Sequence, residues 1–584
     1  MGVTAPRRAL GLIRAAKHVG LEDPTEGSER TGHSCRNAII IGTGGLMHAL
    51  TRATLLLSFA STIASADVAV TIDDSKPHQT MQGFGATTLS LVFNAMDNVP
   101  PALRTQAIDA LYNQVKLTMG NLEVEPFESP ASNVYAPAND DSSTTTFGSF
   151  NWIQSDNMMQ KVVTPGQAFG FDHYWIGPVI STGFALAWAP PLRSSNYQRY
   201  LDELAEHVAA VAIHWRDSYR ITPDYMQLFN EPLSGNGELA GGSVTEIIDI
   251  IKRSGDRLRV EGFATMKFVV TAEETEAISL RDAQMIMADP DARKYVGAIA
   301  YHPYPYGSTY ASVPNILATS GSGTPDAGKV TLRNQLRDLG AQYGIPTMMI
   351  EVSHSDLPFD SFDGVRGRAI QIHDELVYAD AAAFFGMNAM WDTTSHAQHY
   401  QGRADPGFYN ETDTVVLIDN LMNKVVISPM GRAIGHYARW IRRGAVRIDA
   451  IADDPLVQVT AFRDDAQGRL VLVAVNNANA PRTLAVTAAN APALMGTLTG
   501  ERSTSSAVWQ PFTGTTTSTG WSIDLPPHSV TSMAGSIPTI APGGDAGTGE
   551  GSSAGGCCDS GHGTSTSGIA LGLLVAGVLR RRRR

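Results

Sequence analysis

Two glutamates in this sequence each stand at the end of a mostly apolar segment. Glu231 closes Tyr-Met-Gln-Leu-Phe-Asn-Glu-Pro, and Glu351 follows the apolar part of Pro-Thr-Met-Met-Ile-Glu-Val-Ser. Short apolar runs that end at proline or polar residues are typical of buried strands, so each carboxylate should project from a strand end. Two carboxylates that meet in one cavity can divide acid–base work, because one can stay protonated while the other is ionised.

Hydrolysis of a glycosidic bond is the reaction that suits such a pair. One carboxylic acid protonates the departing oxygen, while the other carboxylate attacks or stabilises the cation-like sugar carbon. In enzymes that retain the anomeric configuration, the two groups lie about 5–5.5 Å apart. We expect Glu231 to hold the proton at rest and Glu351 to be ionised. The side chain of Asn230 can donate to the 2-hydroxyl of a bound sugar.

Other candidate strand ends carry residues that could line the same cavity. Tyr301-His302-Pro303-Tyr304 ends one of them, and Trp391 ends another just before Asp392. Trp391, and Trp188 after Ala-Leu-Ala, offer flat apolar faces on which a pyranose ring can stack, although Trp391 could equally be part of the packed barrel. A lone histidine such as His302 is more often packed or hydrogen-bonded than a proton shuttle, so we expect it to have a supporting role.

A metal site has little support in the sequence. Asp392, His396 and His399 fall on one expected loop, and no further ligand is near them in the sequence. Glycosidic hydrolysis by two carboxylates needs no metal. We therefore expect neither a metal nor a cofactor.

The elements that must position these residues alternate between strand and helix patterns. Expected strands cover residues 82–86, 116–122, 185–190, 225–231, 267–272, 296–301, 347–352 and 387–391. Amphipathic helices are expected over 196–219, 244–257, 332–343, 366–384 and 431–440. Such alternation predicts an α/β protein with a closed (β/α)8 barrel, in which catalytic groups lie at the C-terminal ends of the strands. Glu231 and Glu351 would follow the fourth and seventh strands and open into one mouth.

A second domain is expected after Trp440, where the helical patterns stop. Short strands separated by Gly, Asn and Pro turns predict a β-sandwich, and the extended segment 68–72 before the barrel could join it. We therefore expect sandwich strands in 67–80, the barrel in 81–435 and the remaining sandwich in 436–537.

The N-terminal region is typical of a targeting segment. Met47-His-Ala-Leu-Thr-Arg is followed by the mostly apolar run 53–63 and then by Ala64-Ser65-Ala66, which is the pattern of a secretory signal peptide. We interpret 1–66 as an upstream extension and signal peptide, with a mature start near Asp67. An apolar core helix is the alternative.

The C-terminal region also differs in composition from a folded domain. Residues 538–567 are rich in Gly, Ser and Thr, include the pair Cys557-Cys558 and predict a flexible linker. A short hydrophobic segment and an arginine cluster occupy 568–584, where the arginines would stay on the cytoplasmic side of a membrane. The order resembles the C-terminal sorting signal of myxobacterial surface proteins, which implies anchoring at the cell surface or outer membrane. A simple tail anchor is the alternative.

The net charge and the positions of the cysteines indicate which binding partners and which chemistry are disfavoured. The formal net charge of -13 disfavours nucleic acid and anionic bilayers, so we expect a carbohydrate partner, no nucleic acid, and membrane contact only through the C-terminal segment. The three cysteines, Cys35, Cys557 and Cys558, leave the expected domains without thiol chemistry. We expect a secreted monomer.

Together these residues resemble the retaining β-glycosidases built on this barrel, in particular glycoside hydrolase family 30, over about residues 67–535. The motifs that carry the resemblance are Gln82-Gly83-Phe84-Gly85-Ala86, Ala187-Trp188-Ala189-Pro190-Pro191, Asn230-Glu231-Pro232, His302, Tyr304, Ile350-Glu351, Trp391, Ile427-Ser428-Pro429, Arg439 to Arg447 and Pro526 to Val530. The resemblance implies that Glu231 is the acid/base and Glu351 the nucleophile. It also implies sugar contacts for Asn230, Tyr304, Trp188 and Trp391.

Two departures from the family pattern leave the sugar open. Glucosylceramidase-like members carry an aspartate shortly after Gly-Phe-Gly, where this chain has Thr87-Thr88-Leu89-Ser90. The usual arginine at the end of the second strand is also absent from 116–121. The same machinery would serve an endo-acting xylanase or β-1,6-glucanase, or an exo-β-glycosidase of the glucosylceramidase type. A non-catalytic carbohydrate-binding surface protein is the remaining alternative, against which both carboxylates argue.

Overall fold

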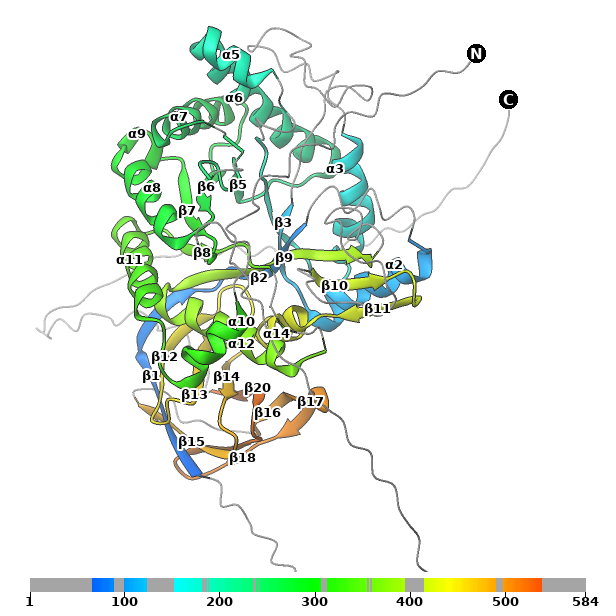
Figure 1. Cartoon of the computed structure of the whole chain (residues 1–584), viewed down its shortest axis with the longest axis vertical. Helices are drawn as coiled ribbons and strands as arrows, with labels where there is room; N and C mark the ends of the chain where they lie inside the picture. Colours follow the sequence, from blue (N-terminus) through cyan, green and yellow to red (C-terminus); the bar gives the residue numbers. More distant parts are fainter. Residues whose placement is uncertain are drawn as a thin grey trace, which may run out of the picture. The chain divides into compact units, whose positions relative to one another are not determined.

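A closed barrel of parallel strands lies at the centre of the part of the chain described by this computed structural model (Figure 1). The structure describes residues 66–88, 99–122, 152–180, 186, 188–234, 238–239, 241–305, 312–353, 357, 360–393, 414–489 and 497–537. The barrel strands are β2 (Gly83–Thr88), β3 (Met119–Leu122), β4 (His173–Ile176), β5 (Tyr225–Gln227), β6 (Lys267–Glu273), β7 (Val296–Tyr301), β8 (Thr347–Met349) and β9 (Ala381–Asp392). They pair in parallel in chain order, and β9 pairs with both β2 and β8, which closes the ring. The predicted barrel is confirmed.

Close packing inside the barrel explains the Gly-Phe-Gly motif on the first strand. A Cβ on Gly85 would lie 2.2 Å from the carbonyl oxygen of Met119, so no larger residue fits there. Met119 belongs to an inner cluster in which side chains from several strands, including Trp175 and Phe385, fill the barrel. Beside β9, the sheet is extended by β10 (Thr414–Asp419), which is parallel to β9, and by β11 (Lys424–Ile427), which is antiparallel to β10.

Helices surround the barrel, because each amphipathic helix buries its apolar face against the strands and its neighbours. On α7, for example, Ile247, Ile250, Ile251 and Leu258 recur at helical spacing and are buried, and Ser243 caps the first turn by accepting from the Glu246 N–H. The helices are α2 (Pro101–Ile108), η2 (Asp109–Val115), α3 (Ile153–Met158), η3 (Met159–Val163), α4 (Thr164–Gln167), α5 (Ala189–Ser195), α6 (Tyr197–His214), η4 (Trp215–Tyr219), α7 (Val244–Val260), α8 (Glu276–Ala288), α9 (Pro290–Arg293), α10 (Val313–Ala318), η5 (Ser320–Ser322), α11 (Ala327–Tyr343), α12 (Phe362–Tyr378) and α14 (Pro429–Ala438).

The third barrel strand is not where the sequence pattern placed it. We expected it at 185–190, but β4 is His173–Ile176, and helix α5 begins at Ala189. His-Tyr-Trp-Ile consists largely of aromatic and β-branched residues, which suit a fully buried strand, whereas prolines at the first positions of a helix favour the start of α5. The expected helix 366–384 also ran too far, because α12 ends at Tyr378 and Asp380 adopts a left-handed φ of 47° before β9.

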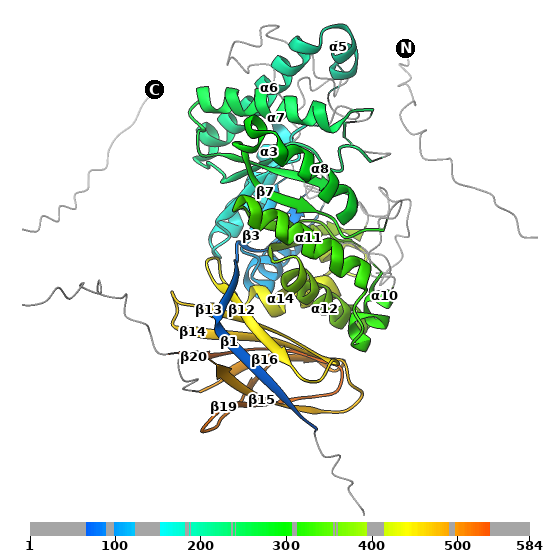
Figure 2. The same cartoon turned by 90° about the vertical axis from the view of Figure 1, so that its left-hand side faces the viewer.

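A second, ten-stranded sheet forms the β-sandwich (Figure 2). Its order is β17-β16-β20-β14-β13-β12-β1-β15-β19-β18. The strands are β1 (Ala66–Thr80), β12 (Val446–Ala452), β13 (Val457–Asp464), β14 (Arg469–Asn476), β15 (Arg482–Ala489), β16 (Thr499–Thr504), β17 (Ala507–Thr513), β18 (Thr515–Thr516), β19 (Gly520–Leu525) and β20 (Ser529–Ser536). β1 runs antiparallel to β12 and parallel to β15, so the segment before the barrel does join the sandwich, as expected.

Buried polar contacts join the sandwich to the helices of the barrel. The ring of His436 on α14 lies between the hydroxyl oxygens of Ser532 and Ser503, at 2.8 and 2.7 Å. Next to it, the guanidinium of Arg439 forms an ion pair with Glu501. Satisfied polar groups of this kind fix one relative orientation of the two surfaces.

The predicted targeting segments at both chain ends lie outside the described residues. These are the upstream extension and signal peptide before residue 66, the linker 538–567 and the C-terminal segment 568–584. Among the helices that the structure describes, none has the length and apolar character needed to cross a membrane.

Candidate active site

Glu231 and Glu351 lie just beyond the C-terminal ends of the fourth and seventh barrel strands, β5 and β8. A carboxylate oxygen of one lies within 4.8 Å of a carboxylate oxygen of the other. Their side chains are 22% and 13% exposed, so both can be reached from outside and both are partly removed from water. The structure therefore brings together the two acids that the sequence singled out.

His302 lies between the two carboxylates. Its ring is fully buried, and its Nδ1 lies 2.9 Å from Oε1 of Glu231 and 3.7 Å from Oε1 of Glu351. Burial alone would lower the pKa of His302, but the negative charge of Glu351 and the hydrogen bond to Glu231 outweigh it and raise the pKa above its ordinary value. A protonated His302 can donate to Glu231 and attract Glu351, and its expected supporting role stays a prediction.

Tyr304 contacts the other carboxylate. Its hydroxyl donates to Oε1 of Glu351 at 3.2 Å and lies 3.2 Å from Oγ of Ser353. Burial and the charge of Glu351 raise the pKa of Tyr304 well above its usual range, so the phenol stays a donor. The resemblance implied a sugar contact for Tyr304, and the structure adds this hydrogen bond to the proposed nucleophile.

Removal of this hydrogen bond should shift the pH dependence of activity. A hydrogen bond to a carboxylate stabilises its ionised form, so in Tyr304→Phe the acidic limb of the kcat/KM profile should move up by about 1 pH unit. The value of kcat should fall about tenfold or more. Measurement of kcat/KM from pH 4 to 8 for both proteins tests this, and superimposable acidic limbs would contradict it.

The loop that carries Glu231 has a constrained backbone. Strand β5 ends at Gln227, earlier than expected, and Glu231 itself adopts a left-handed φ of 45°, which is unfavourable for a residue with a side chain. Its N–H donates to the carbonyl of Ala272 at 2.8 Å. The backbone N–H of Asn230 donates to Oε2 of Glu238, and the Asn230 side chain is half-buried beside the acid.

The two tryptophans have different surroundings. Trp391 is only 2% exposed and belongs to the hydrophobic core, which favours the packing alternative for this residue. Trp188 is half-buried and immediately precedes helix α5, so it does not stand at the end of a strand. The expected stacking roles of both residues stay predictions.

Sequence reasoning missed Glu273, the last residue of β6. It is 0% exposed, and its Oε1 accepts from the backbone N–H of Leu233 at 3.0 Å, two residues after Glu231. Burial, with the nearby charges of Asp282 and Glu231, raises the pKa of Glu273 to about 8. The strand-end criterion that found Glu231 would have found Glu273 as well, but the expected strand 267–272 stopped one residue short.

Comparison with known proteins assigns the C-terminal domain. Residues 444–533 match the model of the glycosyl hydrolase family 30 beta sandwich domain. The match is confined to this segment of the chain. No curated protein matches the sequence.

Solved structures of family 30 enzymes share the fold of barrel and sandwich together. The catalytic domain of GH30 xylanase C from Talaromyces cellulolyticus is 18% identical with a TM-score of 0.57, and the match covers 80% of this chain and 100% of that one. A family 30 subfamily 8 xylanase from Clostridium acetobutylicum is 16% identical with a TM-score of 0.53, covering 80% and 100%. An endo-β-1,6-glucanase is 15% identical with a TM-score of 0.54, covering 80% and 94%. At these identities the likeness concerns the fold, which this chain shares with solved glycosidases.

The three central donors could in principle hold a metal ion. Among the described residues, Glu231, His302 and Glu351 are grouped with ligand atoms within 4.8 Å of one another. The raised pKa of His302 favours the imidazolium form, which has no lone pair to give a metal. Proton transfer between two acids requires the same proximity, and we interpret the cluster in that way.

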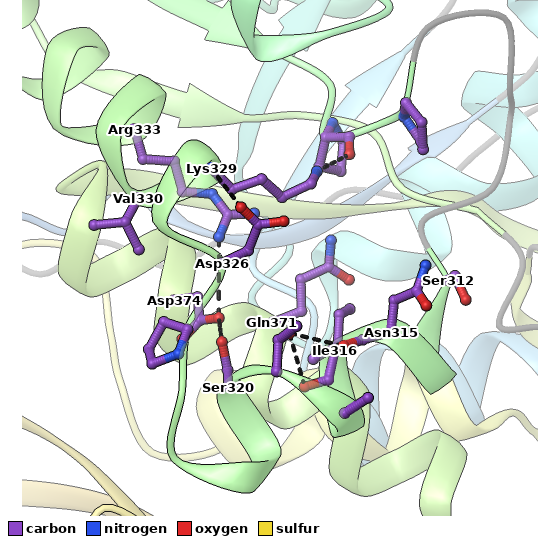
Figure 3. Close-up of a pocket in the computed structure, with 15 residues that line it drawn as sticks. Ser312, Asn315, Ile316, Ser320, Asp326, Lys329, Val330, Arg333, Gln371 and Asp374 are labelled. Carbon is purple, nitrogen blue, oxygen red and sulfur yellow. Dashed lines mark hydrogen bonds and ion pairs between the residues drawn. The ribbon is translucent and has the colours of Figure 1, made fainter.

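A separate pocket of about 350 Å³ lies among residues of α10, α11 and α12 and of the segment that follows β7 (Figure 3). Pro303, between His302 and Tyr304, is part of its wall, and Lys329 on α11 donates to the Pro303 carbonyl at 2.7 Å. Arg333 forms an ion pair with Glu375 at 2.5 Å. The lining includes neither Glu231 nor Glu351.

Proposed function

We propose that the protein is a retaining glycoside hydrolase that cleaves β-linked glycans or glycosides by double displacement. The observation that carries the proposal is the pair of carboxylates at the ends of the fourth and seventh strands, with oxygens within 4.8 Å. That spacing suits direct attack by a carboxylate, because inverting enzymes leave about 6.5–9.5 Å for a water molecule.

In the proposed mechanism, Glu351 attacks the anomeric carbon while Glu231 donates its proton to the leaving oxygen. The Tyr304 hydroxyl and the charge of His302 stabilise the ionised nucleophile before attack. After the first product leaves, Glu231 accepts a proton from water, and that water releases the sugar from Glu351. The half-buried amide of Asn230 is available for the sugar 2-hydroxyl.

For the substrate we propose a β-linked polysaccharide, with xylan and β-1,6-glucan as the first polymers to test. Support comes from the neighbours, which are described as xylanases and an endo-β-1,6-glucanase. At the two positions that depart from the glucosylceramidase pattern, Thr87 and Asn121 are buried and bond within the barrel, to the Ile350 carbonyl and to Gln227. We also propose secretion and surface anchoring, on the basis of the terminal sequence patterns.

The stereochemistry of the first product tests this mechanism. A substrate cleaved by the protein should release a β-configured sugar that then mutarotates, as followed by proton NMR within the first minutes. An α-configured first product would overturn the double displacement. Binding of xylan, glucan or aryl β-glycosides without turnover would instead favour the carbohydrate-binding alternative.

A further inference from the structure

The loop that carries Glu231 is attached to the neighbouring strand β6 at two points. On one side of Pro232, the N–H of Glu231 donates to the carbonyl of Ala272 at 2.8 Å. On the other side, the N–H of Leu233 donates to the side chain of Glu273 at 3.0 Å. The left-handed φ of Glu231 is unfavourable, so its conformation depends on contacts with neighbouring residues. The hydrogen bonds of the Glu231 and Leu233 N–H groups are two such contacts.

Glu273 is also connected to the histidine of the site. Its carbonyl accepts from the N–H of His302 at 3.2 Å, and the ring of His302 bonds to Glu231 at 2.9 Å. On its other side, Ser279 of α8 bonds both the N–H and the carbonyl of Glu273, at 3.2 and 3.3 Å. One residue therefore joins the acid/base loop, the histidine and helix α8.

The charges around the Glu273 carboxyl disfavour its ionisation. It is fully buried, and within the described residues its Oε2 has no hydrogen-bond partner. Asp282 on α8 is also buried and is already paired with Arg281. Glu231 faces it from the loop, and two cationic groups that act on it, His302 and Arg281, bond Glu231 and Asp282 instead. A carboxylic acid in such surroundings is more stable as the neutral form, with one oxygen still able to accept from Leu233.

We propose that Glu273 is a positioning residue for the acid/base Glu231, and that it holds the Leu233 backbone as an uncharged carboxylic acid. The proposal rests on the function proposed above for Glu231. An uncharged group at this point fixes the loop without a further negative charge next to Glu231 and His302. A permanent anion there would make Glu231 harder to ionise after proton donation, when it must act as a base.

The protonation state can be tested without any activity, by thermal unfolding of wild type and Glu273→Gln. The pKa of Glu273 is raised to about 8 in the fold, from about 4.3 in an unfolded chain. The stability linked to its proton is therefore complete below about pH 4 and is lost as pH rises towards 8. Glutamine does not titrate, so the Tm of the variant minus that of wild type should rise by a few degrees between pH 5 and 8 and then level off. A difference that stays flat over that range would overturn the proposal.

Kinetics of two variants test the positioning. Gln keeps an oxygen for the Leu233 N–H, so kcat/KM of Glu273→Gln should stay within about threefold of wild type at pH 6, with the same alkaline limb. Glu273→Leu leaves that N–H unpaired, and kcat/KM on substrates with poor leaving groups should fall about ten- to hundredfold. The fall should be much smaller on activated aryl glycosides, which need little proton donation.

A matched control separates this effect from general destabilisation. Glu246 is a buried glutamate of α7 that pairs with Arg193 and accepts from the Tyr200 hydroxyl, and Glu246→Gln should leave the leaving-group dependence unchanged. Equal loss on both substrate types in Glu273→Leu would overturn the positioning role. So would an alkaline limb shifted to lower pH in Glu273→Gln, since this would reveal a charged Glu273. If wild type has no hydrolytic activity, the proposed function fails, while the unfolding comparison still reports on Glu273.

Discussion

Replacement of Glu351 by glutamine should lower kcat by at least about 10⁴-fold with little change in Tm. An amide of the same shape cannot attack the anomeric carbon, yet its oxygen can still accept from the Tyr304 hydroxyl. The expected loss is therefore chemical rather than structural. Hydrolysis of an activated aryl β-glycoside, with circular dichroism for folding, measures both quantities.

The matched control for this variant is Glu261→Gln. Glu261 has a similar exposure, 19% against 13%, and pairs with Arg257 at the C-terminal end of α7, which leads to the start of β6 and so lies away from the C-terminal strand ends. The activity of Glu261→Gln should stay close to that of wild type.

Azide added to Glu351→Gly should restore turnover and give an α-glycosyl azide, since azide would enter from the face of the missing nucleophile. Retention of more than about one per cent of activity in Glu351→Gln would exclude Glu351 as nucleophile.

Replacement of Glu231 should have an effect that depends on the leaving group. For Glu231→Gln, kcat/KM on substrates with poor leaving groups should fall about 10²–10⁴-fold, because no acid protonates the departing oxygen. Activated dinitrophenyl glycosides leave without that proton, so their kcat/KM should change by less than about tenfold. A series of aryl glycosides with graded leaving-group pKa measures the difference as a slope.

Azide distinguishes the two glutamates. In Glu231→Ala the sugar accumulates on Glu351, and azide should raise kcat by replacing the water that Glu231 would activate, giving a β-glycosyl azide. Equal losses across the leaving-group series, or an α-configured azide product, would be incompatible with the acid/base role.

The sequence predicted those parts of the site that follow from local patterns. Glu231 and Glu351 could be found because each ends a strand, and strand ends of a parallel barrel meet at one mouth. The eight-strand barrel was predicted from the alternation of strand and helix patterns. The third strand, β4, was misplaced because a short apolar run such as Ala-Leu-Ala-Trp can precede a helix as well as form a strand. The spacing of apolar residues alone does not distinguish a short buried strand from an apolar run before a helix.

Contacts between side chains from different strands could not be predicted in the same way. The bond of His302 to Glu231 joins residues 71 positions apart, and the bond of Tyr304 to Glu351 joins residues 47 apart. Such pairings depend on the stagger of the strands and on the curved loop after β5, which includes a left-handed glutamate. Sequence patterns limit which residues reach the mouth, while the backbone geometry decides which of them touch.

The central place of β1 in the second sheet has a consequence for how the chain must be assembled. Ala69 donates to Asp453, 384 residues later, so the sheet cannot be completed until the whole barrel has been synthesised. Until then β1 has no partner, and without β1 both β12 and β15 would present open edges that invite aggregation. The β-sandwich can therefore be completed only when β1, from the start of the folded chain, is in place. A chain that lacks β1, or that ends before β12, would keep strands with unpaired, aggregation-prone edges.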